Sequence, residues 1–168
     1  ITDIAVDGNN NKWIGTADSG IFLVSPNGQE TIYHFTTDNS PMPSNTVNDV
    51  DINGVTGEVF IATNKGLLSF KGTATDANED LNNVYVYPNP VRPGFSGTVK
   101  IRGLLDRANI QITDIQGNLV FETTYEGGTI EWDTTAFGKY KVASGVYMIF
   151  ISSDDGLETK TKKVMIIR

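Results

Sequence analysis

The side chains that could take part in catalysis are few and scattered. His34 is the only histidine, so a Ser-His-Asp triad would have to use it. It lies in Tyr33-His34-Phe35, a run typical of a strand, and no Gly-x-Ser-x-Gly turn is present to expose a nucleophilic serine. Cysteine is absent, which excludes thiolate nucleophiles, thiolate metal sites and disulfides. We therefore expect a structural or surface role for His34 and no enzymatic activity.

One segment carries oxygen ligands at a spacing that partly suits a cation. Asp7-Gly8-Asn9-Asn10-Asn11 places side-chain oxygens at alternate positions, as at the start of a calcium loop. Lys12 and Asp18 stand where that loop needs glycine and glutamate, although Asp18 could serve as a shorter carboxylate. A cation site therefore stays an alternative. A hairpin turn rich in residues that tolerate the left-handed conformation is favoured, and we expect no metal and no cofactor.

A pair of carboxylates allows one further alternative. Glu131 and Asp133 are two residues apart on an expected strand and so share a face, with Ile130 and Trp132 opposite. Glycosidases use paired carboxylates. Carboxylates that flank a buried tryptophan on a small sheet are better explained as a solvated face.

The composition excludes several classes of protein. Asp and Glu (20) outnumber Lys and Arg (13), which gives a formal charge of −7, so we expect no nucleic-acid binding. The longest apolar run, Val146–Ile151, is too short for a transmembrane helix. The chain starts with Ile1 and shows no signal sequence. We therefore interpret it as a processed product or fragment, with any export signal upstream.

The spacing of apolar residues predicts an all-β protein. No segment keeps helical spacing over three turns, and 17 glycines and 6 prolines interrupt the sequence. Alternating runs such as Thr98–Arg102 and Thr129–Asp133 are frequent instead. A length of 168 residues fits two small domains.

The first 71 residues contain an internal repeat at an offset of about 46 residues, close to one four-stranded propeller blade. The recurring segments are residues 1–7 and 47–53, Trp13-Ile14-Gly15-Thr16 and Phe60-Ile61-Ala62-Thr63, and Gly20-Ile21-Phe22 and Gly66-Leu67-Leu68. Strands are expected at 1–6, 12–16, 20–24 and 30–35, and then at 46–52, 58–63 and 66–71.

This pattern resembles the two-component-regulator propeller repeat of Bacteroidetes-type bacteria, which occurs in sensor ectodomains and surface proteins. The resemblance implies that residues 1–71 are incomplete β-propeller blades, about one and three-quarter blades of a β-meander. The residues that carry it are Trp13, Gly15, Thr16, Gly20, Phe60, Ala62, Thr63 and Gly66, together with Pro43-Ser44-Asn45-Thr46-Val47.

The residue types also predict how such sheets pack. Trp13 and Phe60 are expected as large inward anchors between neighbouring sheets, with Gly15 and Ala62 keeping that layer close. Gly20 and Gly66 permit the backbone of the turns.

We do not expect residues 1–71 to form a complete propeller. One blade buries only one face and fewer than two cannot close a ring, so we expect the tail of a longer propeller. Trp13, Tyr33 and Phe35 could line a sugar-binding rim, although core packing is favoured.

A second domain follows a compositional boundary. Residues 72–83 lack periodicity and are expected as a linker. Seven short strands in 84–168 fit an immunoglobulin-like β-sandwich, with Val99, Ile101, Ile110, Ile112 and Trp132 inward. Val146–Ile151 is apolar on both parities, so its second face needs cover. The strands are expected at 84–88, 97–103, 107–114, 119–125, 128–133, 145–152 and 158–167.

Four short motifs follow one another along this second domain. They are Tyr87-Pro88-Asn89-Pro90, Ile112–Val120 with Asp114 and Gly117, Ala143-Ser144-Gly145-Val146-Tyr147, and Thr161–Arg168 with Lys162 and Lys163. Together they resemble the C-terminal sorting domain of the type IX (Por) secretion system. In that family the domain is an address read by the outer-membrane translocon. In most cargo a surface sortase removes it and attaches the protein to anionic lipopolysaccharide.

The resemblance implies partners among translocon and sortase components, and a place at the cell surface or outside the cell after periplasmic export. Pro88 and Pro90 should keep the entry strand out of a central position. Lys160, Lys162 and Lys163 precede an apolar end, so the final strand could be a basic edge that adds to a receptor sheet. Lysines that only guard an edge against aggregation explain the same pattern.

Three functions fit these observations. The favoured one is a non-catalytic component of the type IX sortase complex that keeps its C-terminal domain, uses the propeller as a binding scaffold, and binds anionic lipopolysaccharide or another glycan. The second is secreted cargo with a glycan-acting or adhesive domain upstream. The third is the sensor ectodomain of a hybrid two-component system.

Overall fold

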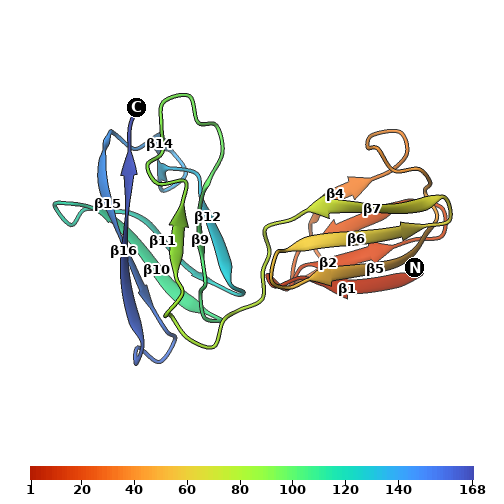
Figure 1. Cartoon of the computed structure of the whole chain (residues 1–168), viewed down its shortest axis with the longest axis horizontal. Coiled ribbons are helices and arrows are strands. Elements are labelled where there is room, and N and C mark those ends of the chain that lie inside the picture. Colours follow the sequence, from red (N-terminus) through yellow and green to blue (C-terminus); the bar gives the residue numbers. More distant parts are fainter. The chain divides into compact units, whose positions relative to one another are not determined.

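The structure, a computed structural model, describes all 168 residues and confirms an all-β protein. It contains sixteen strands, and no helix of the chain could cross a membrane. The chain separates into two compact units, residues 1–76 and 77–168 (Figure 1). Each unit has its own hydrophobic core.

The first unit consists of two antiparallel meanders, one of four strands and one of three (Figure 1). The strands follow the expected spans closely, because each is a short β-rich run bounded by turn-forming residues. They are β1 (Asp3–Val6), β2 (Lys12–Gly15), β3 (Ile21–Val24) and β4 (Thr31–Phe35), and then β5 (Val47–Asn53), β6 (Glu58–Thr63) and β7 (Gly66–Lys71).

The core of this unit lies between the two meanders. Trp13 and Ile21 from the first sheet and Val47 and Ile61 from the second are almost fully buried. Gly15 permits the close approach, because a Cβ atom there would lie 2.9 Å from Val47 Cγ1. The predicted core packing of aromatic residues is present around Trp13, whose ring lies 5.5 Å from that of Phe70. Phe35 packs partly buried against this cluster, whereas Tyr33, which stacks on Phe35, is 44% exposed.

Phe60 does not lie between the two sheets of the first unit. It pairs with Asp51 and Ser69, on the opposite face of the second sheet from the buried Val59 and Ile61. The reason is that equivalent residues of a repeat point the same way along a stack. Trp13 faces the second sheet, and Phe60, with Ala62, faces away from the first.

Residues 72–83, expected as a linker, pack onto the units that flank them. Ala74 and Thr75 are buried against the first unit, where the Asp76 amide donates to the Gly54 carbonyl at 2.8 Å. In the second unit, Asn78 donates to the Leu104 carbonyl at 2.8 Å and Leu81 is buried in the core. Backbone hydrogen bonds hold most of this segment in place. The spacing of apolar residues, on which the linker prediction rests, does not reveal such bonds.

The second unit is a β-sandwich whose seven main strands form sheets in the orders β11-β10-β15-β16 and β12-β9-β8. The immunoglobulin-like expectation is confirmed. The strands are β8 (Tyr85–Tyr87), β9 (Val99–Arg102), β10 (Ala108–Asp114), β11 (Leu119–Tyr125), β12 (Thr129–Trp132), β15 (Gly145–Ser152) and β16 (Thr159–Ile166). A short hairpin, β13 (Thr135–Ala136) and β14 (Tyr140–Lys141), was not predicted.

All five predicted inward residues lie in the core of the sandwich and are fully buried: Val99, Ile101, Ile110, Ile112 and Trp132. In Val146–Ile151 one parity faces the core, with Tyr147, Ile149 and Ile151 buried. The other parity ends in Phe150, which is 43% exposed. The second face of this apolar run is therefore on the surface of the unit.

Candidate functional site

The Tyr87-Pro88-Asn89-Pro90 motif carries the chain from one sheet of the sandwich to the other. Tyr87 ends β8, an edge strand, as the prolines predict. Val91, directly after the motif, forms a parallel bridge with Ile166 of the other sheet. The Val91 amide donates to the Met165 carbonyl at 2.8 Å, and Ile167 donates back to the Val91 carbonyl at 2.9 Å. The motif therefore ties the two sheets together at one edge.

Asn89 extends this pairing with its side chain. Its Nδ2 donates to the Lys163 carbonyl at 2.9 Å, and its Oδ1 accepts from the Met165 amide at 3.1 Å. The amide thus satisfies the two backbone groups that a neighbouring strand would satisfy. Asn89 and Val91 together close the C-terminal half of the β16 edge.

Asp114 organises the turn between β10 and β11. One carboxylate oxygen accepts from the backbone amides of Gln116 and Asn118, at 2.8 and 2.9 Å, and the other from Asn118 Nδ2 at 2.7 Å. These hydrogen bonds, led by that of the Asn118 side chain, lower the pKa of the Asp114 carboxyl. Gly117 has a φ of 88°, which the turn requires and which a residue with a Cβ atom rarely adopts.

Gly145, Val146 and Tyr147 open β15, opposite the end of β16, where they pair with Ile166, Met165 and Val164. The Tyr147 hydroxyl donates to the Ala143 carbonyl at 3.0 Å, and its ring lies 5.6 Å from that of Trp132. Burial, and secondarily the nearby Asp114 carboxylate, raise the pKa of the Tyr147 phenol. Tyr147 therefore stays neutral and anchors the start of the strand.

The lysines of β16 lie on both faces of an edge strand. Lys160 and Lys162 pair with the core residues Ile151 and Ile149, so they point toward the core side and are half-buried. Lys163 lies on the outer face. Inward-pointing charges on an edge strand are a known device against aggregation. This placement agrees with the protective interpretation of Lys160 and Lys162.

The structure brings most of the predicted sorting-motif residues together. Asn89, Gly145–Tyr147 and Lys162–Lys163 lie on neighbouring segments, and Asp114 pairs with Tyr147 across β10 and β15. Outside this group lie Tyr87, Pro88, Pro90 and Gly117, which shape the chain beside it.

Sequence reasoning missed the role of Arg168. Its guanidinium donates to Thr134 Oγ1 at 2.7 Å and to the Val142 carbonyl at 3.2 Å, and its backbone amide donates to Ser144 Oγ at 2.9 Å. Arg168 thereby holds the segment that contains the unpredicted β13–β14 hairpin. A single arginine after an apolar run gives no pattern from which these contacts could be predicted.

The repeat residues of the first unit form two turns with a common hydrogen bond. Thr16 Oγ1 donates to the Gly20 carbonyl at 2.7 Å, and Thr63 Oγ1 donates to the Gly66 carbonyl at the same distance. Gly20 and Gly66 both have positive φ, 78° and 147°. The two repeats therefore share this threonine-to-glycine hydrogen bond, although the first turn is one residue longer.

The groups considered for chemistry have structural roles. The Asp7 carboxylate accepts from the amides of Asn9 and Asn11 and from Asn11 Nδ2, which is the arrangement of a hairpin turn. Burial raises the pKa of Asp7 in spite of these hydrogen bonds. The His34 ring stacks on Phe22 at 3.9 Å, and its Nε2 lies 2.8 Å from the Ser19 carbonyl. No cluster of acidic or histidine side chains in the chain could hold a metal ion.

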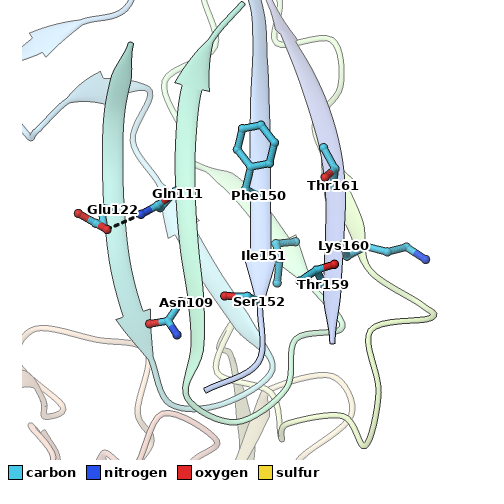
Figure 2. A pocket seen from close by; sticks show the side chains of 9 residues that line it. All are labelled: Asn109, Gln111, Glu122, Phe150, Ile151, Ser152, Thr159, Lys160 and Thr161. Atoms are coloured by element: carbon cyan, nitrogen blue, oxygen red, sulfur yellow. Dashed lines mark hydrogen bonds between the residues drawn. The ribbon is translucent and has the colours of Figure 1, made fainter. Parts of the chain in front are cut away.

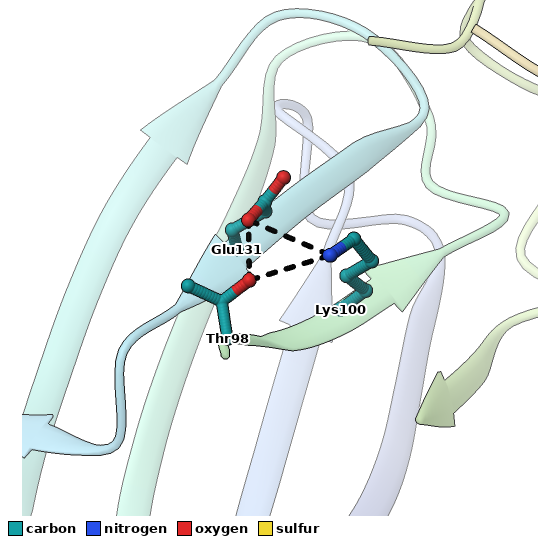
Figure 3. Close-up of polar contacts among 3 residues, drawn as sticks. All are labelled: Thr98, Lys100 and Glu131. Carbon is teal, nitrogen blue, oxygen red and sulfur yellow. Dashed lines mark hydrogen bonds and ion pairs between the residues drawn. The ribbon is translucent and has the colours of Figure 1, made fainter. Parts of the chain in front are cut away.

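Glu131 and Asp133 bind different partners, and Figure 3 shows those of Glu131. Glu131 accepts from the Thr98 hydroxyl and lies 3.7 Å from Lys100 Nζ, across the β9–β12 pair. Asp133 accepts from the backbone amide and the hydroxyl of Thr135. Each carboxylate thus supports local structure on an exposed face.

Comparison with known proteins identifies the second unit. Residues 85–167 match the family model described as the secretion system C-terminal sorting domain. The second unit is a sorting domain. None of the curated proteins compared with the sequence matches it.

Among solved structures, the chain is similar to PorZ of Porphyromonas gingivalis, described as an essential bacterial surface component of the type-IX secretion system. The identity is 34%, the TM-score is 0.65, and the match covers 99% of this chain and 22% of PorZ. The chain thus spans less than a quarter of that protein. The sorting domain and this similarity associate the chain with type IX secretion and imply export to the cell surface or outer membrane.

Proposed function

We propose that the chain is the C-terminal part of a non-catalytic, PorZ-like surface component of the type IX secretion system. In this proposal residues 84–168 are the translocation signal and a protein-interaction module, and residues 1–71 are blades of a longer propeller that serves as a binding scaffold. The observation that carries it is the 34% identity to PorZ over 99% of the chain, across both units. A sorting domain alone would match in its own residues only.

Two features of the first unit support the propeller. Trp13 and Phe60 point in the same direction along the stack, as successive blades require. The far face of the first sheet also carries exposed apolar residues, with Ile4 and Val6 each more than half exposed at 51% and 55%. A blade before the first sheet and another after the second would cover these faces.

The placement of the polar groups supports a non-catalytic role. His34 lies in the first unit, far in sequence from Glu131 and Asp133 at the end of β12, and each of the three has a structural partner. In this proposal the protein acts by binding through its surface. Its partners are the translocon, the sortase components and anionic lipopolysaccharide.

The open part of the β16 edge is the contact that we propose for the translocation machinery. The backbone groups of Lys163, Met165 and Ile167 that point outward are taken by Asn89 and Val91. Since outward-pointing residues alternate along an antiparallel strand, Thr159 and Thr161 also present their backbone groups outward. An extended segment of a receptor could pair there.

Replacing Thr161 tests this contact in the full-length protein in its host. Thr161→Pro removes an outward amide from an edge strand, a position where proline is tolerated, so the fold should persist while surface display falls. Lys162→Gln is the matched control, because it changes the charge and keeps the backbone donor. Surface display is measured by protease accessibility on whole cells, and folding by the melting temperature of the purified protein. Normal display of a folded Thr161→Pro protein would contradict the edge contact.

Secreted cargo is the second candidate, because a sorting domain is the address of cargo in the family that the sequence resembles. Intact mass of the surface protein separates the two. A component retains residues 84–168, whereas cargo loses them to the sortase. Deleting residues 84–168 should abolish export in both cases, and undisturbed export would overturn both.

A further inference from the structure

We propose that the outer face of the sheet β11-β10-β15-β16 binds an uncharged saccharide. This face carries a hollow of about 500 Å³ (Figure 2). The binding activity would be additional to sorting, and it stands or falls independently of the secretion role.

A row of side chains crosses the sheet through this hollow. Strand register places Glu122, Gln111, Phe150 and Thr161 side by side on four successive strands. At the usual strand spacing the row is about 14 Å long, which is roughly the length of three linked sugar rings. The hollow is therefore long enough for an oligosaccharide lying across the strands.

Phe150 lies in the middle of the row, and 43% of its surface is exposed. Figure 2 shows its ring standing on β15 between the polar residues of β10 and β16. An exposed aromatic ring offers a flat, electron-rich face. The axial C–H groups of a pyranose ring form a complementary, slightly positive apolar face.

Polar groups surround this ring. Gln111 Nε2 donates to Glu122 Oε1 at 2.6 Å, which orients both side chains and leaves Gln111 Oε1 and Glu122 Oε2 as acceptors. Asn109 Oδ1 accepts from the Thr124 hydroxyl at 2.6 Å, which leaves Asn109 Nδ2 as a donor. The Ser152 and Thr161 hydroxyls also line the hollow. Such a mixture of donors and acceptors matches sugar hydroxyls, which both donate and accept.

The lining disfavours other ligands. The Glu122 carboxylate repels anions, and the Lys160 side chain points away from Phe150 (Figure 2). A lipid or an apolar peptide would cover one aromatic ring and leave the surrounding amides and hydroxyls without water or partners. An uncharged saccharide can satisfy both the ring and the polar groups.

Titration of the isotope-labelled 168-residue chain with neutral trisaccharides tests the proposal. The probes are maltotriose, cellotriose, mannotriose and triacetylchitotriose, with trigalacturonate as the charged comparison. We expect at least one neutral probe to shift the side-chain amide signals of Asn109 and Gln111, and trigalacturonate to bind more weakly. Shifts with the charged probe alone, or with none of the probes, would overturn the proposal.

Variants of the ring provide the decisive comparison. Phe150→Ala should weaken binding about tenfold, since stacking is lost, while Phe150→Trp should retain it. Phe137→Ala, at another exposed phenylalanine of the same unit, is the control and should bind normally. Melting temperatures check that each variant is folded. Equal affinity of the parent and Phe150→Ala chains, or dimerisation through this face in place of sugar binding, would refute the site.

Discussion

The side-chain amide of Asn89 binds both the Lys163 carbonyl and the Met165 amide, and so takes the place of a strand beside the end of β16. The two segments are more than 70 residues apart in sequence, so this contact closes the sandwich. It gives the most characteristic motif of the second unit a physical role. The motif covers one half of the β16 edge and leaves the other half open.

Replacing Asn89 should loosen the end of β16. Asn89→Ala removes two hydrogen bonds at an exposed edge and is expected to lower the free energy of unfolding of the second unit by about 1–2 kcal/mol. Amide hydrogen exchange at Met165 should accelerate, while exchange at Ile149 follows global unfolding only. Asn89→Asp keeps the acceptor for Met165 and should show the smaller change at that amide. Unchanged exchange at Met165 in Asn89→Ala would contradict the pairing.

The two tryptophans should respond differently to replacement by phenylalanine. Trp132 Nε1 donates to the Thr135 carbonyl at 2.9 Å inside the core, whereas the buried Trp13 Nε1 has no hydrogen-bond partner. Trp132→Phe should therefore cost its unit about 1 kcal/mol more than Trp13→Phe costs the first. Urea unfolding followed by NMR resolves the two units. A larger cost for Trp13→Phe would show that the missing hydrogen bond does not govern the difference.

Asp7 and Asp114 should titrate in opposite directions although they form the same turn. Both accept from the backbone amides two and four residues ahead and from an asparagine side chain. Burial raises the pKa of Asp7 above the usual 3.8, while hydrogen bonds lower that of the exposed Asp114 below it. Carboxyl NMR titration measures both.

The sign of the pH dependence follows from these directions. Asp114 stabilises the fold above its unfolded pKa, and this contribution is lost as the pH falls through its lowered folded pKa. Asp7 acts in reverse, since its neutral form is favoured in the fold and stability is gained as the pH falls through its raised pKa. Asp114→Asn should remove the first dependence and leave the second. The same acid sensitivity in Asp114→Asn and the parent would exclude Asp114 as its source.

Arg168 should stabilise the segment that contains the β13–β14 hairpin. Arg168→Ala removes the bonds of the guanidinium to Thr134 and Val142, and we expect a loss of about 1–3 kcal/mol in the second unit with faster exchange of the Val142 amide. Arg168→Lys keeps the charge without the planar fork and should recover part of the loss. Full recovery by lysine would indicate that charge alone matters.

The sequence predicts the parts of this fold that depend on local alternation. Val99, Ile101 and Trp132 are inward because strand side chains alternate, and the structure confirms them. The anchor role of Phe60 stays a prediction, because alternation does not say which face of a repeated sheet meets its neighbour and Phe60 lies on the far face of the second sheet. The contacts of Asn89 and Arg168 bind backbone groups of distant segments, so they depend on tertiary structure that residue type and spacing do not specify. The short β13–β14 hairpin has too few residues to show a period.

Phe60 and Val59 test whether the first unit is part of a longer stack. Val59 is 1% exposed between the two sheets, so Val59→Ser should destabilise the 168-residue chain by about 1–3 kcal/mol. Phe60→Ser changes only the far face and should cost much less in this chain. In a longer protein with a further blade on that face, Phe60→Ser should cost as much as Val59→Ser, because Phe60 then occupies the position that Trp13 has here. Thermal unfolding of both variants in both contexts measures this. An equally small effect of Phe60→Ser in the two contexts would mean that no blade covers the second sheet.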